Sequence, residues 1–314
     1  MSNKKTIINW ELTLHCNLDC SFCSQQERRY KQKKEITEQE AKKIIDHLPK
    51  NCHLSFLGWE TLLFPNIKNI FSYLEKKDIS FEITTNATLG KTFFEELKQY
   101  KKLEKINISI DGYGDFHDLS RGKKGLFEKI IATIEVLSPE KYISVSTFVS
   151  PHLSHESLQK LYFELNKRKV PEQKLVYCMS FWEQEKILSQ EKIPELLIAQ
   201  PWETKKEERL YKKSFFEKLL ILKKQEDITK VSFEPDGIIW RNHLYCKQID
   251  EQYRINENGE ISTCEFIKNS FWNLIENSFE DIIEKNEYKN LKQKIQFNFP
   301  LEICKNCCKL SKHS

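Results

Sequence analysis

Short apolar runs alternate with amphipathic segments along the chain from Thr6 to about Met179. The apolar runs have the length and composition of strands, and the segments between them place apolar residues at helical spacing. Six strands are predicted, at Thr6–Leu14, His53–Leu57, Ser80–Thr84, Lys105–Ile110, Tyr142–Val149 and Lys174–Met179. Repeated βα units predict an α/β fold with a parallel sheet covered by helices. Six units favour a partial (β/α)6 TIM-like barrel over a closed eight-fold barrel.

Two further patterns concern helices and domains. Thr37 followed by Glu40 forms a capping box ahead of the apolar positions of a helix. After Ser180 the chain becomes a long charged segment that reaches about Gln225, and its apolar residues recur at the spacing of a solvated helix with one buried face. Beyond that point the pattern turns to strands and loops. The sequence therefore predicts a barrel domain over residues 1–225 and a small cysteine-rich domain over residues 226–314.

Composition narrows the class of protein. Lys and Arg number 50 against 46 Asp and Glu, giving a net charge of +4, and the two signs are interspersed, so nothing favours a nucleic-acid partner. The chain has no apolar stretch long enough for a membrane span and no signal peptide, so a cytoplasmic location is expected. Ten cysteines in such a chain point to metal ligation or redox chemistry rather than to disulfides.

Three cysteines lie close together just past the first predicted strand. Cys16, Cys20 and Cys23 have the spacing Cys-x3-Cys-x2-Cys, on a loop at the end of a barrel strand, where folds of this class build active sites. Structural zinc takes four protein ligands, whereas three thiolates on a [4Fe–4S] cluster leave one iron open for another ligand. The alternative is a zinc loop that takes His15 or a distant cysteine as its fourth ligand.

The spacing, with the aromatic Phe22 directly before the last cysteine, resembles the radical S-adenosylmethionine (SAM) superfamily. That resemblance implies a [4Fe–4S] cluster on the three cysteines, with SAM bound to its open iron. It also implies reductive cleavage of SAM to a 5′-deoxyadenosyl radical that abstracts a substrate hydrogen, with an electron donor such as flavodoxin or ferredoxin.

Later strand ends resemble the same superfamily in the expected order. In SFLGWETLLFP, Trp59 stands where a second glycine is usual and Thr61 where a proline is usual. Glu60 would accept the SAM amino group, and Arg121 would pair with the SAM carboxylate. The cofactor-binding residues implied by the resemblance are Phe22, Gly58, Glu60, Asn86, Ser109, Asp111 and Arg121.

The C-terminal region carries a second group of thiols. A Cys-x12-Gly-x4-Cys segment is followed by a helix and a Cys-x2-Cys pair, and four thiolates complete a closed site for zinc or for a [4Fe–4S] cluster. The candidate ligands are Cys246, Cys264, Cys304 and Cys307. The segment is similar to the auxiliary-cluster domains called SPASM and, in shortened form, Twitch. Because the chain stops at Ser314 before further cysteines, the shorter form with one auxiliary cluster is expected.

Other cysteines give candidates for catalysis. Cys178 is predicted at the end of the sixth strand, facing the substrate, although a small core residue is the more ordinary role there. Cys308 lies beside Cys307 and could be an alternative ligand, a hydrogen-atom donor or a spare thiol. Cys52 fits a half-buried position before the second strand.

The resemblance predicts an oxidoreductase-type reaction on a small sugar-like molecule or a peptide. An alternative is a ribosomal-peptide maturase that crosslinks, oxidises or epimerises its substrate. The first strand is predicted to start at Thr6, with no fused leader-binding module before it, which favours a small molecule or a peptide delivered by a separate partner. The alternative from another class is a non-catalytic iron–sulfur or zinc protein with a degenerate barrel, which the Trp59 and Thr61 departures would allow.

Overall fold

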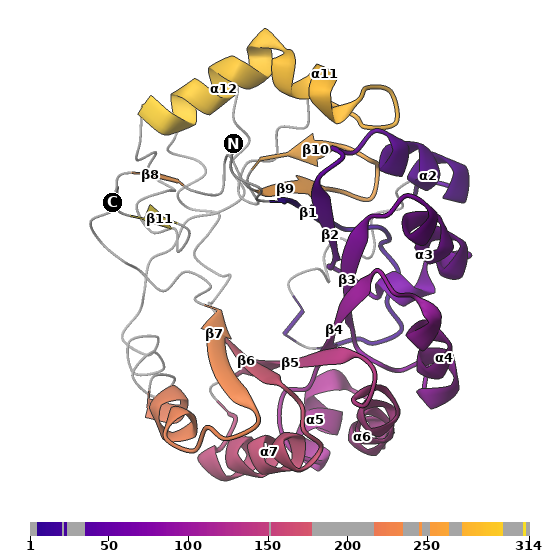
Figure 1. Cartoon of the computed structure of the whole chain (residues 1–314). Helices are drawn as coiled ribbons and strands as arrows, with labels where there is room; N and C mark the ends of the chain where they lie inside the picture. The colour runs from indigo at the N-terminus through magenta and orange to yellow at the C-terminus, as the bar shows by residue number, and fades with distance from the viewer. Residues whose placement is uncertain are drawn as a thin grey trace.

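The structure is a computed structural model, and it describes residues 5–20, 22–23, 35–150, 152–177, 217–234, 245–246, 252–263, 272–297 and 310–311. Its centre is a curved sheet with helices on the outer side (Figure 1). Seven strands run parallel in chain order around this sheet: β1 (Thr6–Trp10), β2 (Cys52–Phe56), β3 (Ser80–Thr85), β4 (Leu103–Ser109), β5 (Tyr142–Val149), β6 (Glu172–Tyr177) and β7 (Lys230–Glu234). The predicted α/β partial barrel is confirmed.

Helices connect the consecutive strands and cover the outside of the sheet (Figure 1). They are α2 (Glu38–Asp46), α3 (Ile67–Lys76), α4 (Lys91–Glu96), α5 (Asp115–Arg121), α6 (Leu126–Leu137) and α7 (His155–Lys167), with short 3-10 turns at Thr61–Leu63 and Leu97–Gln99 and a further helix over 217–223. The capping box at α2 is present, with the Glu40 amide donating to the Thr37 hydroxyl at 3.2 Å and the Thr37 amide donating to the Glu40 carboxylate at 2.7 Å. Among the described residues, no helix has the length and apolar character needed to cross a membrane.

The strand predictions agree with the structure to within a few residues, except at the end of β1. That strand stops at Trp10 rather than at Leu14. The reason is local, because the Thr13 hydroxyl accepts a hydrogen bond from the His15 amide at 3.1 Å and so stabilises a turn in place of extended backbone. The chain therefore leaves the sheet several residues before the first cysteine.

The C-terminal region extends the barrel sheet at its other edge. Strand β9 (Gln252–Ile255) runs parallel to β1, and β10 (Ile261–Ser262) pairs antiparallel with β9. Helices α11 (Phe279–Glu284) and α12 (Asn286–Phe297) follow, while β8 (Tyr245–Cys246) and β11 (Leu310–Ser311) form a separate two-stranded sheet. The sheet order β10-β9-β1-β2-β3-β4-β5-β6-β7 thus places residues from both predicted domains in one sheet.

The two faces of the barrel sheet differ in chemistry. Successive side chains of a strand point to opposite faces, and the apolar outward set packs in two core clusters, one with Leu54, Ile83 and Ile106 and one with Val149, Leu175 and Val231. Many of the alternate positions, which face the interior, are polar: Ser55, Ser80, Glu82, Thr84, Lys105, Asn107, Ser109, Ser144, Ser146, Glu172 and Ser232. Ile7, Tyr142, Phe148 and Val176 share this alternation, so the interior face combines hydrogen-bonding and apolar side chains.

Cross-strand hydrogen bonds order this interior face. The Asn107 side-chain oxygen accepts from the hydroxyls of Ser144 at 2.8 Å and Ser146 at 3.0 Å. The Lys105 ammonium and the Glu172 carboxylate are 3.0 Å apart. Pairs of this kind satisfy the polar groups that line the barrel.

Candidate active site

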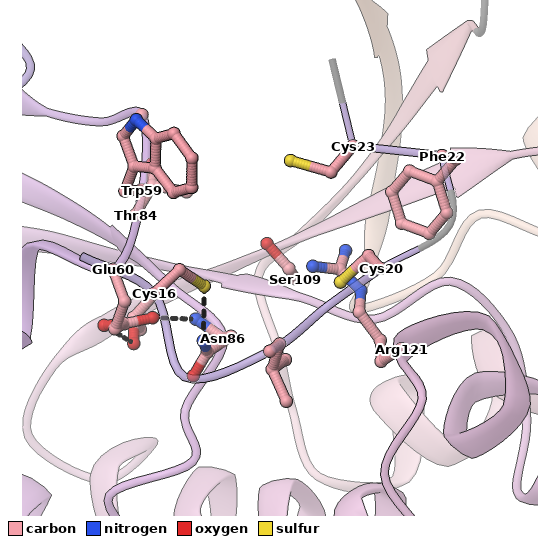
Figure 2. Close-up of a pocket in the computed structure, with 13 residues that line it drawn as sticks. Cys16, Cys20, Phe22, Cys23, Trp59, Glu60, Thr84, Asn86, Ser109 and Arg121 are labelled. Carbon is pink, nitrogen blue, oxygen red and sulfur yellow. Dashed lines mark hydrogen bonds between the residues drawn. The ribbon is translucent and has the colours of Figure 1, made fainter. Parts of the chain in front are cut away.

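A pocket of about 540 Å³, including its part open to solvent, lies where the first four strands end. Figure 2 shows its walls, which come from the loop after β1, the loop after β2 and the ends of β3 and β4. The lining residues are Cys16, Leu18, Cys20, Phe22, Cys23, Gly58, Trp59, Glu60, Thr84, Thr85, Asn86, Ser109 and Arg121. The lining combines thiols, a carboxyl, an amide and a guanidinium, which suit a metal cluster and a charged organic cofactor.

The three cysteines predicted as cluster ligands all line this pocket, and none of them forms a disulfide. The Cys23 amide donates to the Cys20 carbonyl at 3.1 Å, which closes the tight turn between them. Burial raises the pKa of the Cys20 thiol to about 11, although the nearby Arg121 charge acts in the opposite direction. Without a metal the thiol is therefore protonated at neutral pH, and a bound metal would displace the proton.

The cysteine set suits a [4Fe–4S] cluster. Three thiols line the pocket, and three thiolates on such a cluster leave one of its four irons open for another ligand. His15, the alternative zinc ligand, does not line the pocket; its Nε2 lies 3.2 Å from the Glu35 carboxylate.

Hydrogen bonds from neighbouring segments hold the cysteine loop in place. Glu35 accepts from the Thr13 hydroxyl at 3.0 Å and also from the Leu14 amide. The Glu60 amide donates to the His15 carbonyl at 2.9 Å, which joins the loop after β1 to the loop after β2. The backbone around Cys16 is therefore fixed before any ligand binds.

Glu60 is a buried carboxylate with two hydrogen-bond donors. Its two oxygens accept from the Thr85 hydroxyl and from the Asn86 amide, each at 2.7 Å. Burial raises the pKa of Glu60 to about 7, because the cost of desolvating the charge exceeds the gain from these hydrogen bonds. A carboxyl with this pKa exchanges a proton near neutral pH, and its remaining lone pairs are available to a cationic ligand.

Asn86 connects the cysteine loop to the end of β3. Its side-chain nitrogen donates to the Asn17 side-chain oxygen Oδ1 at 3.0 Å. The same nitrogen lies 3.7 Å from the Cys16 sulfur (Figure 2). Its side-chain oxygen accepts from the Thr88 hydroxyl at 2.7 Å. This network fixes the amide beside Cys16, where an N–H donor stabilises a ligating thiolate.

Arg121 is held by Asp111 in a bidentate ion pair. The guanidinium donates from Nε to one carboxylate oxygen at 2.6 Å and from Nη2 to the other at 2.9 Å. Burial lowers the pKa of Arg121, but the Asp111 charge outweighs this, and the net pKa lies above its ordinary value. Asp111 is fully buried behind the guanidinium and does not line the pocket, so it positions Arg121.

Aromatic rings cover the other side of Arg121. Its guanidinium carbon is 5.2 Å from the centre of the Phe22 ring, and Phe22 stacks on Phe148 at 4.3 Å. Behind Asp111, Nδ1 of the buried His117 accepts a hydrogen bond from the Asp111 amide. Burial lowers the pKa of His117 to about 4, so it is neutral at physiological pH. Because Asp111 and the Phe22 ring cover the other sides of the guanidinium, its remaining N–H groups are the ones that face the pocket.

The Gly58–Glu60 turn has a backbone that needs glycine at its first position. Gly58 has φ +97°, and a Cβ there would lie 2.8 Å from Cγ of the buried Glu11. Trp59, where the superfamily usually has glycine, is buried and forms part of the pocket wall. The departure therefore adds an apolar aromatic surface to the pocket without changing the tight turn.

The C-terminal candidates are described only in part. Gly259 has φ +79° in the turn between β9 and β10, where a Cβ would lie 2.9 Å from Ile44. The backbone of Cys246, the first candidate ligand, pairs with Leu310. The remaining candidates lie outside the described residues: Cys178, Cys264, Cys304, Cys307 and Cys308.

The structure also adds residues to the predicted site. Leu18, Thr84 and Thr85 line the pocket, and Glu11 and His117 support its walls. The two threonines could have been found from their position at the end of the third predicted strand. Nothing in the sequence near Glu11 or His117 marks them as part of the site, because their contacts are set by the tertiary fold.

A parallel barrel whose strand ends gather three thiols, a buried guanidinium and a buried carboxyl defines a barrel protein with a cluster-binding pocket. Residues 10–165 match the profile of the radical SAM superfamily, and residues 246–308 match that of SPASM, an iron–sulfur cluster-binding domain. The chain belongs to the radical SAM superfamily and carries a SPASM domain. These domains imply SAM and [4Fe–4S] clusters as cofactors.

Curated relatives match about half of the chain. An AdoMet-dependent heme synthase of Methanosarcina barkeri is 33% identical over 171 residues, which cover 53% of this chain and 48% of the relative. The antilisterial bacteriocin subtilosin biosynthesis protein AlbA of Bacillus subtilis is 34% identical over 134 residues, covering 41% of this chain and 30% of the relative. The matches thus span about half or less of these relatives.

Solved structures share the fold over nearly the whole chain. Streptococcus suis SuiB bound to S-adenosylmethionine superposes with a TM-score of 0.70 at 15% identity, covering 97% of this chain and 72% of that one. Native anSMEcpe, with bound AdoMet and a peptide, superposes with a TM-score of 0.61 at 15% identity, covering 98% of this chain and 91% of that one. At these identities the similarity establishes the fold.

Proposed function

We propose that this radical SAM enzyme catalyses an oxidoreductase-type reaction that begins with removal of a carbon-bound hydrogen from a peptide or a small polar molecule. The observation that carries the proposal is the convergence of Cys16, Cys20, Cys23 and Arg121 on one pocket at the strand ends. Bound there, the cluster and SAM supply a 5′-deoxyadenosyl radical as the hydrogen-abstracting group.

The residues of the pocket divide the task of binding SAM. The three cysteines hold the cluster, and Asn86 donates toward Cys16. Arg121, fixed by Asp111, presents its free N–H groups to the SAM carboxylate. Glu60, in its ionised form, accepts a hydrogen bond from the SAM amino group.

Other residues shape the space around the cofactor. Ser109 lies in the wall at the end of β4, and Gly58 allows the backbone to approach closely. Phe22 and Trp59 cover the pocket with apolar surface, which excludes water from a reactive species.

Hydroxyl groups in the pocket wall support a hydrogen-bonding substrate. Thr84 and Ser109 line the pocket at the ends of β3 and β4, and their hydroxyls suit peptide groups or sugar hydroxyls. Relatives named for peptide maturation, including subtilosin biosynthesis protein AlbA and sporulation killing factor maturation protein SkfB, are compatible with this substrate class. A peptide reaction would make the protein a ribosomal-peptide maturase.

A tetrapyrrole is the competing substrate class, because several relatives are named as heme synthases and one as an Fe-coproporphyrin III synthase. A flat macrocycle with large apolar faces needs apolar walls. Leu18, Phe22 and Trp59 provide apolar wall in the pocket, so a tetrapyrrole is the second candidate substrate.

The SPASM region supplies the second part of the proposal. Cys246, Cys264, Cys304 and Cys307 are proposed to hold an auxiliary [4Fe–4S] cluster that accepts an electron from the substrate radical or binds the substrate, and Cys178 and Cys308 remain the candidates for a thiol near the substrate. A flavodoxin or ferredoxin would reduce the first cluster.

The test is anaerobic reconstitution followed by iron, sulfide and zinc analysis and an assay for 5′-deoxyadenosine after addition of SAM and dithionite. Two clusters require about eight irons and eight sulfides per chain. Replacing Cys16, Cys20 and Cys23 together by alanine should remove about half of the iron and abolish 5′-deoxyadenosine. Zinc without sulfide, or nucleoside formation that survives the triple substitution, would contradict the proposal.

A further inference from the structure

An ion pair joins the SPASM region to the segment just ahead of the cysteine loop. Arg254, on β9, contacts the Glu11 carboxylate through Nη2. Glu11 directly follows β1 and is 1% exposed, and its amide donates to the Ile255 carbonyl at 2.9 Å. Two residues 243 positions apart in the sequence are thus held together by the parallel pairing of β9 with β1.

The Glu11 side chain in turn packs against the wall of the pocket. The position that a Cβ of Gly58 would occupy is 2.8 Å from Glu11 Cγ and 3.2 Å from Glu11 Oε1. Gly58, Trp59 and Glu60 all line the pocket. Glu11 therefore forms the support on which the turn of residues 58–60 rests.

A buried carboxylate keeps its place only while a counter-charge compensates for its desolvation. Without the Arg254 charge, Glu11 loses the ion pair that holds its carboxylate beside Gly58. The side chain against which Gly58 packs can then shift. The turn of residues 58–60 would then lose the contact that fixes its position.

We propose that Arg254, acting through Glu11, is a positioning residue for the 58–60 wall, so that the SPASM region sets the affinity of the pocket for SAM. The SAM part of this inference rests on the proposed function, whereas the effect on the backbone of residues 58–60 does not. The Arg254–Glu11 ion pair thus connects the SPASM region to the pocket that the three cysteines line.

The experiment uses the full-length reconstituted protein and two measurements. Amide hydrogen exchange of residues 57–62 is measured without SAM, and SAM affinity is measured by titration. The variants are Arg254→Met, Arg254→Lys, Glu11→Gln and the double variant Glu11→Gln/Arg254→Met. The matched control is Arg168→Met, since Arg168 is also mostly buried and pairs with Glu135 and Glu164 outside the pocket.

Arg254→Met should speed exchange at residues 57–62 and weaken SAM binding by about tenfold, a typical size for coupling between two sites. Arg254→Lys should lie nearer the wild type because it keeps the charge. The double variant should bind SAM more tightly than Arg254→Met, because it removes both charges of the pair together. If Arg254→Met does not fold, Arg254→Lys and Glu11→Gln carry the same comparison.

Unchanged exchange at residues 57–62 in every folded variant would overturn the inference. An equal effect of Arg168→Met would do so as well, since it would reveal general destabilisation. A wild-type protein that fails to bind SAM would count against the proposed function, while faster exchange in Arg254→Met would still establish the positioning contact.

Discussion

The pKa of Glu60 gives a prediction for SAM binding as a function of pH. If this carboxyl accepts a hydrogen bond from the SAM amino group, its ionised form does so far more strongly than its neutral form. Because burial raises the pKa of Glu60 to about 7, only about one molecule in eleven is ionised at pH 6, against about ten in eleven at pH 8. The apparent dissociation constant scales inversely with the competent fraction, so affinity should fall about tenfold from pH 8 to pH 6.

The measurement is a SAM titration of the anaerobically reconstituted protein between pH 6 and pH 8. Glu60→Gln cannot ionise, so it should bind more weakly at pH 8, and it should retain only the pH dependence of SAM itself. The difference between the wild type and Glu60→Gln therefore isolates the carboxyl. Identical pH profiles for the two proteins would refute the assignment of Glu60 as the partner of the amino group.

Glu82 provides a matched control on the same sheet. Although burial opposes its ionisation, hydrogen bonds from His53 and Ser55 lower the pKa of Glu82 to about 2. This carboxylate is ionised throughout the range from pH 6 to pH 8. Glu82→Gln should therefore keep the pH dependence of the wild type, and a flattened profile in this variant would show that the effect does not come from Glu60.

Three further predictions concern the walls of the pocket. Asp111→Asn leaves Arg121 without its counter-charge and should lower the free energy of unfolding by about 3 kcal/mol. Urea unfolding measures this loss, and a value near zero would mean that water replaces the carboxylate. Gly58→Ala combines a left-handed φ with a 2.8 Å approach to Glu11 and should cost more than the matched Gly125→Ala, whose Cβ would meet nothing within 4 Å; equal unfolding midpoints would remove the packing argument. Trp59→Gly, which restores the residue usual in the superfamily, should lower stability by about 3 kcal/mol through the cavity it leaves, and an unchanged melting temperature would show that Trp59 contributes no packing.

Much of the fold could be predicted from the local pattern of apolar and polar residues. The alternation of apolar runs with helical spacing predicts the βα order because burial imposes a period on the sequence that does not depend on distant residues. The positions of Cys16, Cys20 and Cys23 were predicted as one site for the same reason, since a tight loop keeps neighbours together. The end of β1 was predicted too late, at Leu14, because the turn that ends it depends on the Thr13 hydroxyl.

The sequence by itself determined the parallel barrel, the cysteine loop and the polar residues at the strand ends, because each depends on the spacing of residues that are close together in the chain. Only the tertiary structure decided how these residues are used. It placed Asp111 behind Arg121 rather than in the pocket, gave Glu60 two donors and a raised pKa, and joined Arg254 to Glu11. These outcomes depend on strand register and on burial, which arise from contacts between residues that are distant along the chain.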